Sequence, residues 1–242
     1  MAKIKHLVGG EFTRLNKYNL FIASVVVALI WVAVGYFLSV EEFKAFLPFV
    51  FLMEASAMTA ILVGAEMFYE KKEHTISSML ISPMTETEYI TSKILANILN
   101  VLITFVLIGA SMYFLKDFLF AYHWLILSVS IVTAFYVLIG IVLSYLSKDF
   151  TALLMNYFVM MVILVIPSIL VMIGVFAPEV KDILFWSPTE ATLRMMNASF
   201  ASTVDLKQFA LDFAYISLLS YLLFRFVVLP RFKSYATRDL GV

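Results

Sequence analysis

The chain has 242 residues, of which 63% are hydrophobic and 14% are charged, whereas a soluble domain carries about 45–50% apolar and about 25% charged residues. A soluble core of this size cannot hide so much apolar surface, so the composition excludes a soluble protein. The formal net charge of +0 gives no support for nucleic-acid binding. The absence of cysteine excludes disulfides and thiolate metal sites.

Six hydrophobic runs are long enough to cross a bilayer, which takes about 20 mostly apolar residues per helix. They cover residues 20–40, 46–68, 94–115, 124–146, 152–176 and 209–229. Twelve of the 17 Lys and Arg residues lie on the side that holds both termini. Cytoplasmic flanks are enriched in Lys and Arg, so we expect a multi-pass cell-membrane protein with both termini in the cytoplasm. The predicted fold is all-α, a single transmembrane domain over residues 1–242.

Residues 1–18 precede the first run. Apolar residues such as Leu7 and Phe12 recur there at helical spacing between basic ones, which predicts an amphipathic helix in the membrane interface. The alternative is a frayed basic tail, because Gly9 and Gly10 each cost a helix interior about 1 kcal/mol.

Local signals predict several helix boundaries. Residues 41–45 are expected to form a turn, with Pro48 in the first turn of the second span. The Thr85–Glu88 spacing is that of a capping box and predicts a helix that continues into the third span. The external segment 177–207 is expected to form short helices that dip into or lie on the membrane, one of them starting at Ser187 and Pro188.

Two intramembrane residues are candidates for a transport pathway. Glu54 lies inside the second span, where an acid is costly and marks either a functional site or a paired group. Pro167 lies inside the fifth span and is expected to kink it.

Catalytic and nucleotide-binding motifs are absent. The sequence has no Gly-x-x-x-x-Gly-Lys-Ser/Thr, no His-Glu-x-x-His and no Gly-x-Ser-x-Gly. The three histidines lie in separate polar flanks, so they do not predict a metal cluster. We therefore expect no enzyme activity and no cofactor in this chain, and we expect another protein to supply the energy for its function.

The polar stretch 69–93, between the second and third spans, resembles the signature region of the permease subunits of ABC exporters of the second type. The matching residues are Glu70, Glu73, Thr75, Leu80, Pro83 and Lys93, with His74 where that family usually has Gly. The order of an amphipathic helix, six spans and an external element before the last span is also similar. A weaker likeness is Ser187-Pro188-Thr189, which resembles an Asn-Pro step of that family.

The resemblance implies a coupling helix at residues 72–81 that docks on a separate cytoplasmic ABC ATPase, which would bind the ATP and Mg. The docking residues would be Glu70, Glu73, Thr75, Ile76, Met79, Leu80 and Pro83. The loop with Lys148 and Asp149 would make a second contact, and the N-terminal helix a third. Independently, Ile76, Met79 and Leu80 recur at i, i+3 and i+4, which indicates one small apolar face suited either to a soluble partner or to lipid.

The resemblance further implies a homodimer or heterodimer of permease subunits in the lipid bilayer, with the pathway between spans one, two and five. The expected function is export of a small amphiphilic or drug-like substrate. Lipid, polysaccharide or haem-linked cargo are alternatives within the family. A passive channel or a membrane scaffold without an ATPase is the alternative outside it.

Overall fold

The computed structural model describes residues 2–79, 83–117, 121–177, 179–201 and 203–237. Within these residues the chain is helical and contains no β-strand. Six helices are long and apolar enough to cross a membrane, and this confirms the predicted number of spans. They are Leu20–Phe37, Val40–Lys72, Glu86–Lys116, Tyr122–Leu146, Phe150–Val171 and Leu206–Thr237.

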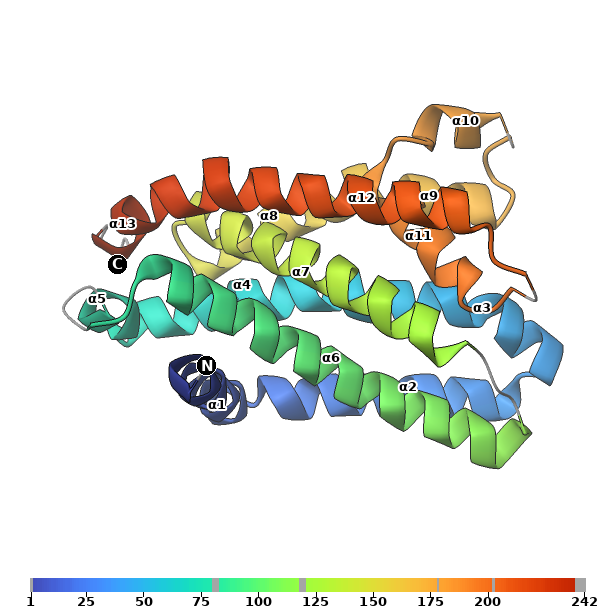
Figure 1. Cartoon of the computed structure of the whole chain (residues 1–242), viewed down its shortest axis with the longest axis horizontal. Helices are drawn as coiled ribbons and strands as arrows, with labels where there is room; N and C mark the ends of the chain where they lie inside the picture. Colours follow the sequence, from blue (N-terminus) through green and yellow to red (C-terminus); the bar gives the residue numbers. More distant parts are fainter. Residues whose placement is uncertain (1, 80–82, 118–120, 178, 202, 238–242) are drawn as a thin grey trace.

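The spans run side by side as one bundle, with the shorter helices at its two ends (Figure 1). The elements in chain order are α1 (Ala2–Lys17), α2 (Leu20–Phe37), α3 (Val40–Met53), η1 (Glu54–Met58), α4 (Thr59–Lys72), α5 (Thr75–Met79), α6 (Glu86–Lys116), α7 (Tyr122–Leu146), α8 (Phe150–Met160), η2 (Met161–Val165), α9 (Ile166–Met172), α10 (Val180–Leu184), α11 (Pro188–Ala198), α12 (Leu206–Leu222), η3 (Leu223–Val228) and α13 (Leu229–Thr237). Here η marks a π-helical segment.

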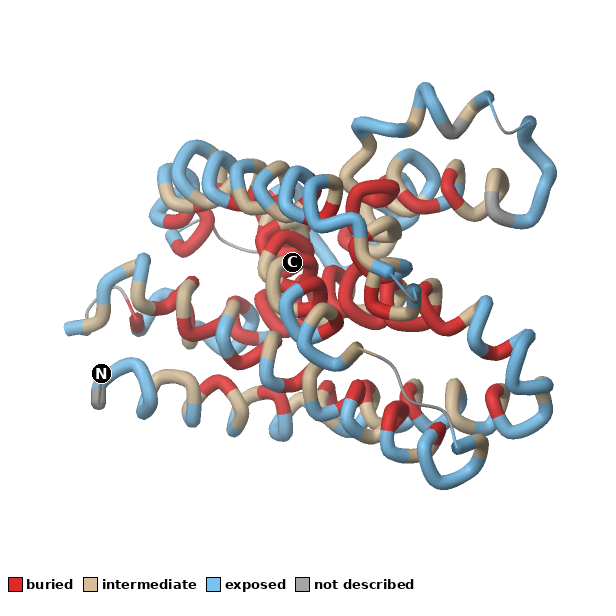
Figure 2. Tube along the Cα trace, turned by 45° about the vertical axis from the view of Figure 1, so that its right-hand side comes forward, coloured by how far each residue is buried: buried red, intermediate tan, exposed pale blue. Residues whose placement is uncertain are grey.

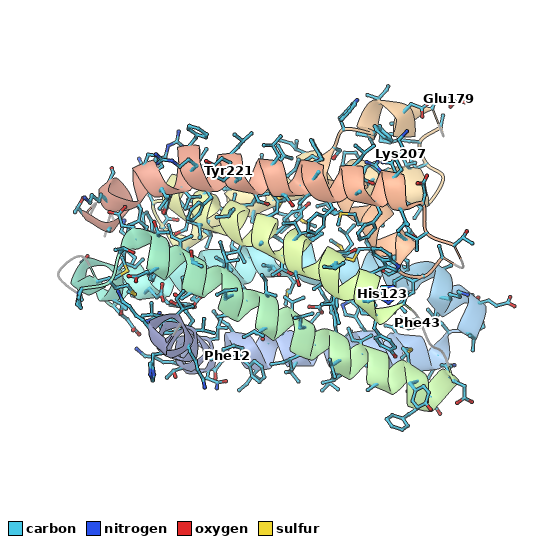
Figure 3. The ribbon with its side chains drawn as sticks, in the orientation of Figure 1. Phe12, Phe43, His123, Glu179, Lys207 and Tyr221 are labelled. Atoms are coloured by element: carbon cyan, nitrogen blue, oxygen red, sulfur yellow. The ribbon has the colours of Figure 1, made fainter. Side chains whose placement is uncertain are left out.

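The two ends of the bundle carry different elements. α1, α5 and α13 lie together with both termini at one end, and α10 and α11 lie at the other (Figure 1). The labelled side chains follow this division, with Phe12 toward the first end and Glu179 and Lys207 at the second (Figure 3). An even number of spans places both termini on one side, as the sequence predicts.

The second and fourth spans form the centre of the bundle. In the most apolar 18-residue stretch of Val40–Lys72, 67% is buried inside the protein. The corresponding share is 17% in Phe150–Val171 and in Leu206–Thr237. Figure 2 shows that these outer helices are largely exposed along one face. Their exposed large apolar side chains include Phe158 and Phe226. A bilayer would cover these faces, because apolar surface is stable in contact with lipid tails.

Glycine allows α4 and α7 to pack closely at the bundle centre. A Cβ on Gly140 would lie 2.6 Å from the carbonyl oxygen of Ala60 and 3.1 Å from the Cβ of Val63. Gly64 faces the same crossing, where an added Cβ would lie 3.6 Å from the Gly140 carbonyl oxygen. Small residues at such crossings let helix backbones approach one another.

Helix caps correct one predicted boundary and confirm two. The second span begins at Val40, not after residue 45, because Ser39 and Glu42 form a capping box. The expected turn over residues 41–45 is therefore helical, and Pro48 lies inside the helix. The predicted capping box of Thr85 and Glu88 is present. α11 begins at Pro188, as predicted.

Two of the π-helical segments immediately precede a proline. η2 ends two residues before Pro167, and η3 ends two residues before Pro230. Proline has no N–H and its ring clashes with the carbonyl four residues earlier, which in both helices belongs to the π segment. The helix of the sixth span continues past Pro230 as α13 and ends at Thr237, beyond the predicted range of residues 209–229.

We predict that Gly140→Ala destabilises the protein by about 1–3 kcal/mol, the usual cost of forcing extra volume into a packed core. Unfolding in a denaturing detergent series will measure this. Gly9→Ala is the matched control, because an added Cβ there has nothing within 4 Å and should stabilise helix α1 slightly. Equal effects of the two substitutions would contradict close packing at Gly140.

Candidate functional site

The polar stretch 69–93 forms a corner between two spans. α4 ends at Lys72, the short helix α5 runs from Thr75 to Met79, and α6 begins at Glu86. His74 turns the chain between α4 and α5 with φ 58°, a left-handed conformation that glycine adopts most readily. The glycine usual at this position in the family that the segment resembles suits the same backbone.

The apolar face of α5 points into the chain itself. Ile76 and Met79 are 0% and 6% exposed and belong to a cluster with Phe232 and Tyr235 of α13. The expectation that these two side chains face a partner is therefore wrong, because α13 already covers them. The exposed residues of the corner include the polar residues His74 and Ser78. Of the other predicted docking residues, Thr75 is half-buried, Pro83 is exposed and Leu80 lies outside the described residues.

Glu70 also faces inward, and it belongs to a buried group of charges. The ammonium of Lys93, on α6, lies 2.9 Å from Glu66 Oε1, 3.2 Å from Glu70 Oε2 and 3.0 Å from Glu11 Oε2. All four side chains are at most 1% exposed. Lys93 thus joins α6 to α4 and to the N-terminal helix α1.

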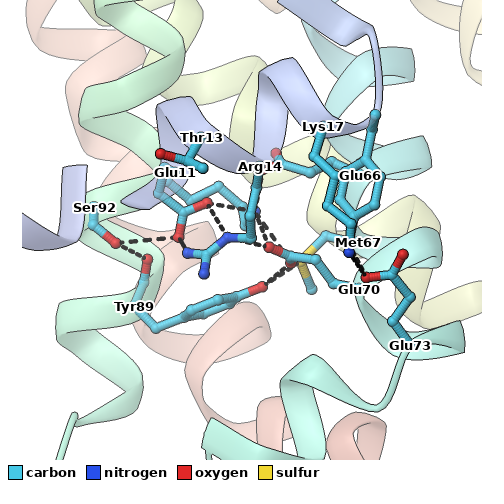
Figure 4. A network of polar contacts seen from close by, with 12 residues as sticks. Glu11, Thr13, Arg14, Lys17, Glu66, Met67, Glu70, Glu73, Tyr89 and Ser92 are labelled. Atoms are coloured by element: carbon cyan, nitrogen blue, oxygen red, sulfur yellow. Dashed lines mark hydrogen bonds and ion pairs between the residues drawn. The ribbon is translucent and has the colours of Figure 1, made fainter. Parts of the chain in front are cut away.

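A second cation completes this group, which we call the charge cluster: Glu11, Arg14, Glu66, Glu70 and Lys93. The Arg14 guanidinium lies between the carboxylates of Glu11 and Glu70, with its Nε 2.8 Å from Glu70 Oε1 (Figure 4). Burial by itself would raise the pKa of Glu11, but Lys93 and Arg14 outweigh it and hold this pKa below its ordinary value. Burial opposes the charge of Arg14 too, yet Glu11 and Glu70 raise its pKa.

Tyr89 and Ser92 add neutral donors from α6. The Tyr89 hydroxyl donates a hydrogen bond to Glu70, and the Ser92 hydroxyl lies 3.5 Å from Glu11 Oε1 (Figure 4). The sequence predicted α1 as a helix but did not predict these contacts. The helix prediction is correct, and the alternative of a frayed tail is wrong, because α1 is held to α4 and α6 by buried charges.

Exposed pairs continue this contact at the surface. Glu73 pairs with Lys17 and accepts a hydrogen bond from the Tyr18 hydroxyl at 2.9 Å. These two partners lower the pKa of Glu73, while burial and the Glu73 carboxylate raise that of Tyr18. Lys3 pairs with Glu88 at 2.7 Å. Such solvated pairs contribute little each, so the buried charges dominate.

The three carboxylates resemble a metal site in composition. Glu11, Glu66 and Glu70 each place an oxygen within 4.8 Å of the others. The Lys93 ammonium lies among them at ordinary ion-pair distances, where a metal ion would otherwise sit. The triad therefore already holds a cation that belongs to the chain.

The C-terminal helix α13 packs against the polar corner and is hydrogen-bonded to α4, α5 and α7. The Tyr235 hydroxyl lies 2.6 Å from Ser144 Oγ on α7 and 3.2 Å from the Met67 carbonyl oxygen on α4. Ser77 of α5 donates to the Ala236 carbonyl oxygen at 3.0 Å. The sixth span predicted from the sequence ends at residue 229, and no helix is predicted beyond it. The helical spacing of Phe232, Tyr235 and Ala236 was the signal in the sequence that could have predicted this helix. Pro230 obscured it, because proline is unfavourable inside a helix.

The second predicted contact loop has a local structural role. Asp149 accepts a hydrogen bond from the Ala152 N–H at 2.8 Å and so caps α8. Lys148 is exposed beside it. Phe150 packs on Phe68 and Tyr69 of α4, with ring centroids 5.6 and 6.4 Å apart. This loop thus contacts the same end of the second span as the polar corner.

The two pathway candidates lie in different surroundings. Glu54 is 3% exposed at the start of η1, and its Oε1 has no hydrogen-bond partner among the described residues. Pro167 lies at the start of α9, after the π segment. The structure does not bring these two residues into one site with the charge cluster, which occupies the end of the bundle.

We predict that Lys93→Met lowers the free energy of unfolding by about 3–5 kcal/mol, because removing one partner of a buried pair leaves uncompensated charge. Detergent unfolding followed by circular dichroism will measure the loss. Lys3→Met is the control, since the Lys3 side chain is 53% exposed, and it should have little effect. Similar stabilities for the two variants would contradict the dominance of the buried pairs.

We predict that acid releases α1. The pKa of Glu11 is below its ordinary value of 4.5 in the folded chain, so its contribution is fully present above that pH and is lost as pH falls through the lower folded value. Spin labels at the exposed positions Thr13 and Thr87 will report α1 docking as a distance. Glu11→Gln should dock more weakly at neutral pH and lose most of this acid dependence. A distance that does not change in acid would contradict the prediction.

The described geometry is that of a membrane chain whose second and third spans are joined by buried charges beneath a polar corner. Comparison with protein-family models and with curated proteins finds no match for this chain. The functional interpretation therefore depends on the corner, the charge cluster and the likeness of the segment 69–93.

Proposed function

We propose that the chain is the membrane subunit of an ABC exporter of the second type, energised by a separate cytoplasmic ATPase. The observation that supports this most is the position of α5. It is a short helix with an exposed polar side, and it connects two spans that Lys93 joins a few turns further on. A partner that displaces α5 would move both spans together.

The contact with the ATPase would use polar residues of the corner. His74 and Ser78 are exposed, and Glu73 is held in place by Lys17 and Tyr18 of the N-terminal region. The buried Ile76 and Met79 would anchor α5 to α13 and thereby pass its displacement to the sixth span. Lys148 and Asp149 would provide the second contact, at the end of α4 where Phe150 packs.

Two copies, or this chain and a homologue, would form the pathway between them. The first and fifth spans have the exposed apolar faces that such an interface needs. Only 22% and 17% of their most apolar 18-residue stretches are buried inside the chain. The second span is mostly buried, so it would line less of this pathway than the sequence leads us to expect. Glu54 and Pro167 remain our candidates for residues that respond to substrate.

A small amphiphilic or drug-like substrate suits an apolar surface groove of the bundle. This groove of about 350 Å³ lies open between α6 and α7 and is lined by residues that include Phe105, Tyr113 and Leu125. Ligand pockets for drug-sized molecules have volumes of about 300–1,000 Å³ and mostly apolar walls. This volume supports a small substrate over a polysaccharide.

We predict that Ser78→Arg weakens association with the ATPase at least tenfold without unfolding the chain, because Ser78 is exposed on α5. A cytoplasmic ABC ATPase from the same organism will be co-expressed, and its co-purification and ATP hydrolysis will be measured. Asn197→Arg, an exposed position at the opposite end, is the matched control. Ile76→Asp should instead reduce the yield of folded protein.

Three outcomes would contradict the proposed function. One is normal association and ATP hydrolysis with Ser78→Arg. Another is the absence of any P-loop ATPase bound to the purified wild-type chain. The third is ion conduction by the purified chain in liposomes without nucleotide, which would favour the passive channel.

A further inference from the structure

The charge cluster has more acidic than basic groups. Glu11, Glu66 and Glu70 supply three carboxyl groups, whereas Lys93 and Arg14 supply two cations. The three carboxyl groups and the ammonium are at most 1% exposed, so water cannot screen the excess. Among the described residues, Tyr89 is a further ionisable group in contact with the cluster, and its hydroxyl donates to Glu70. The nearby Lys17 and Glu73 are exposed and neutralise each other.

The three carboxyl groups differ in how well their negative charge is stabilised. Glu11 pairs with Arg14 and Lys93, and the Ser92 hydroxyl lies within reach. Glu70 pairs with both cations and accepts from Tyr89. Glu66 has a single close cation, at 2.9 Å, and that contact lacks hydrogen-bond geometry.

Glu66 is thus a fully buried carboxyl group that points into the cluster with both oxygens free of hydrogen bonds among the described residues. Carboxyl groups that share one buried site do not all ionise, because the like charges repel and burial penalises each of them. The group with the fewest donors is the one that retains a proton.

We propose that the charge cluster is a proton-binding site that holds one proton at neutral pH, carried by Glu66. With this proton the cluster has no net charge, and α1, α4 and α6 remain together. Loss of the proton in alkali leaves one uncompensated buried negative charge. Separation of α1 relieves this charge by letting water reach the cluster. Arg14 on α1 is already 25% exposed, and the α1 ion pairs outside the cluster, Lys3–Glu88 and Lys17–Glu73, are at the surface.

This proton site is independent of the proposed transport function. It requires only the contact between α1, α4 and α6 within one chain, so it can be tested on the purified protein without an ATPase. Failure of ATPase binding would leave it unaffected.

Infrared spectroscopy tests the proton directly. A buried protonated carboxyl group has a carbonyl-stretch band that is distinct from carboxylate bands and shifts in D2O. We expect this band at neutral pH in the wild type and its loss in Glu66→Gln. Glu54→Gln is the matched control, because Glu54 is a second buried acid with an oxygen free of hydrogen bonds. A band unchanged by Glu66→Gln, or no band in Glu54→Gln, would overturn the proposal.

The distance between spin labels at Thr13 and Thr87 tests the consequence. The wild type should show release of α1 as the infrared band disappears in alkali, and Glu66→Gln should stay docked at that pH. Release of α1 at the same pH in both proteins would overturn the proposal. If Glu66→Gln does not fold, Glu54→Gln tests the proposal instead. The carbonyl-stretch band that remains in Glu54→Gln must then disappear over the same pH range in which α1 is released.

Discussion

The buried ammonium of Lys93 determines how three helices can be arranged at one end of this bundle. Transfer of an ion from water into a protein interior costs several kcal/mol, and that cost is offset only when counter-charges and hydrogen bonds surround the ion. Here the counter-charges come from α1 and α4, while Lys93 itself belongs to α6. At neutral pH none of the three helices can leave this arrangement without breaking ion pairs between buried side chains. The position of α1 therefore follows from the chemistry of Lys93.

The sequence predicts the spans well because their signal is local. Hydrophobic runs of about 20 residues identify a spanning helix without reference to any other part of the chain. The caps at Thr85 and Pro188 are local signals too, and both predictions are confirmed. The turn predicted over residues 41–45 is wrong because Ser39 supplied an earlier cap, and its Ser-x-x-Glu spacing was present in the sequence.

The charge cluster was much harder to predict, since its members are distant in the sequence. Lys93 and Glu11 are 82 residues apart, and no periodicity links them. The spacing of Glu66 and Glu70 does place two acids on one face of a helix, which indicates a buried counter-charge nearby. Which of the 17 basic residues provides it depends on how the helices pack. The same limit applies to Ile76 and Met79, whose apolar face is real but is covered by a helix that lies beyond the end of the predicted sixth span.

The π-helical segments suggest how a displacement at the corner would spread. α6 and α7 are regular α-helices of 31 and 25 residues, so movement at Lys93 would be carried along α6 as a rigid body. The fifth and sixth spans instead contain η2 and η3, each followed by a proline. Such segments lack the regular hydrogen bonds that stiffen an α-helix, and they are common positions for bends. These two spans are also the least buried, so they can bend with the fewest packing contacts to break. Rigid α6 and α7 beside bendable outer spans would convert a push on α5 into a change at the lipid-facing side of the bundle.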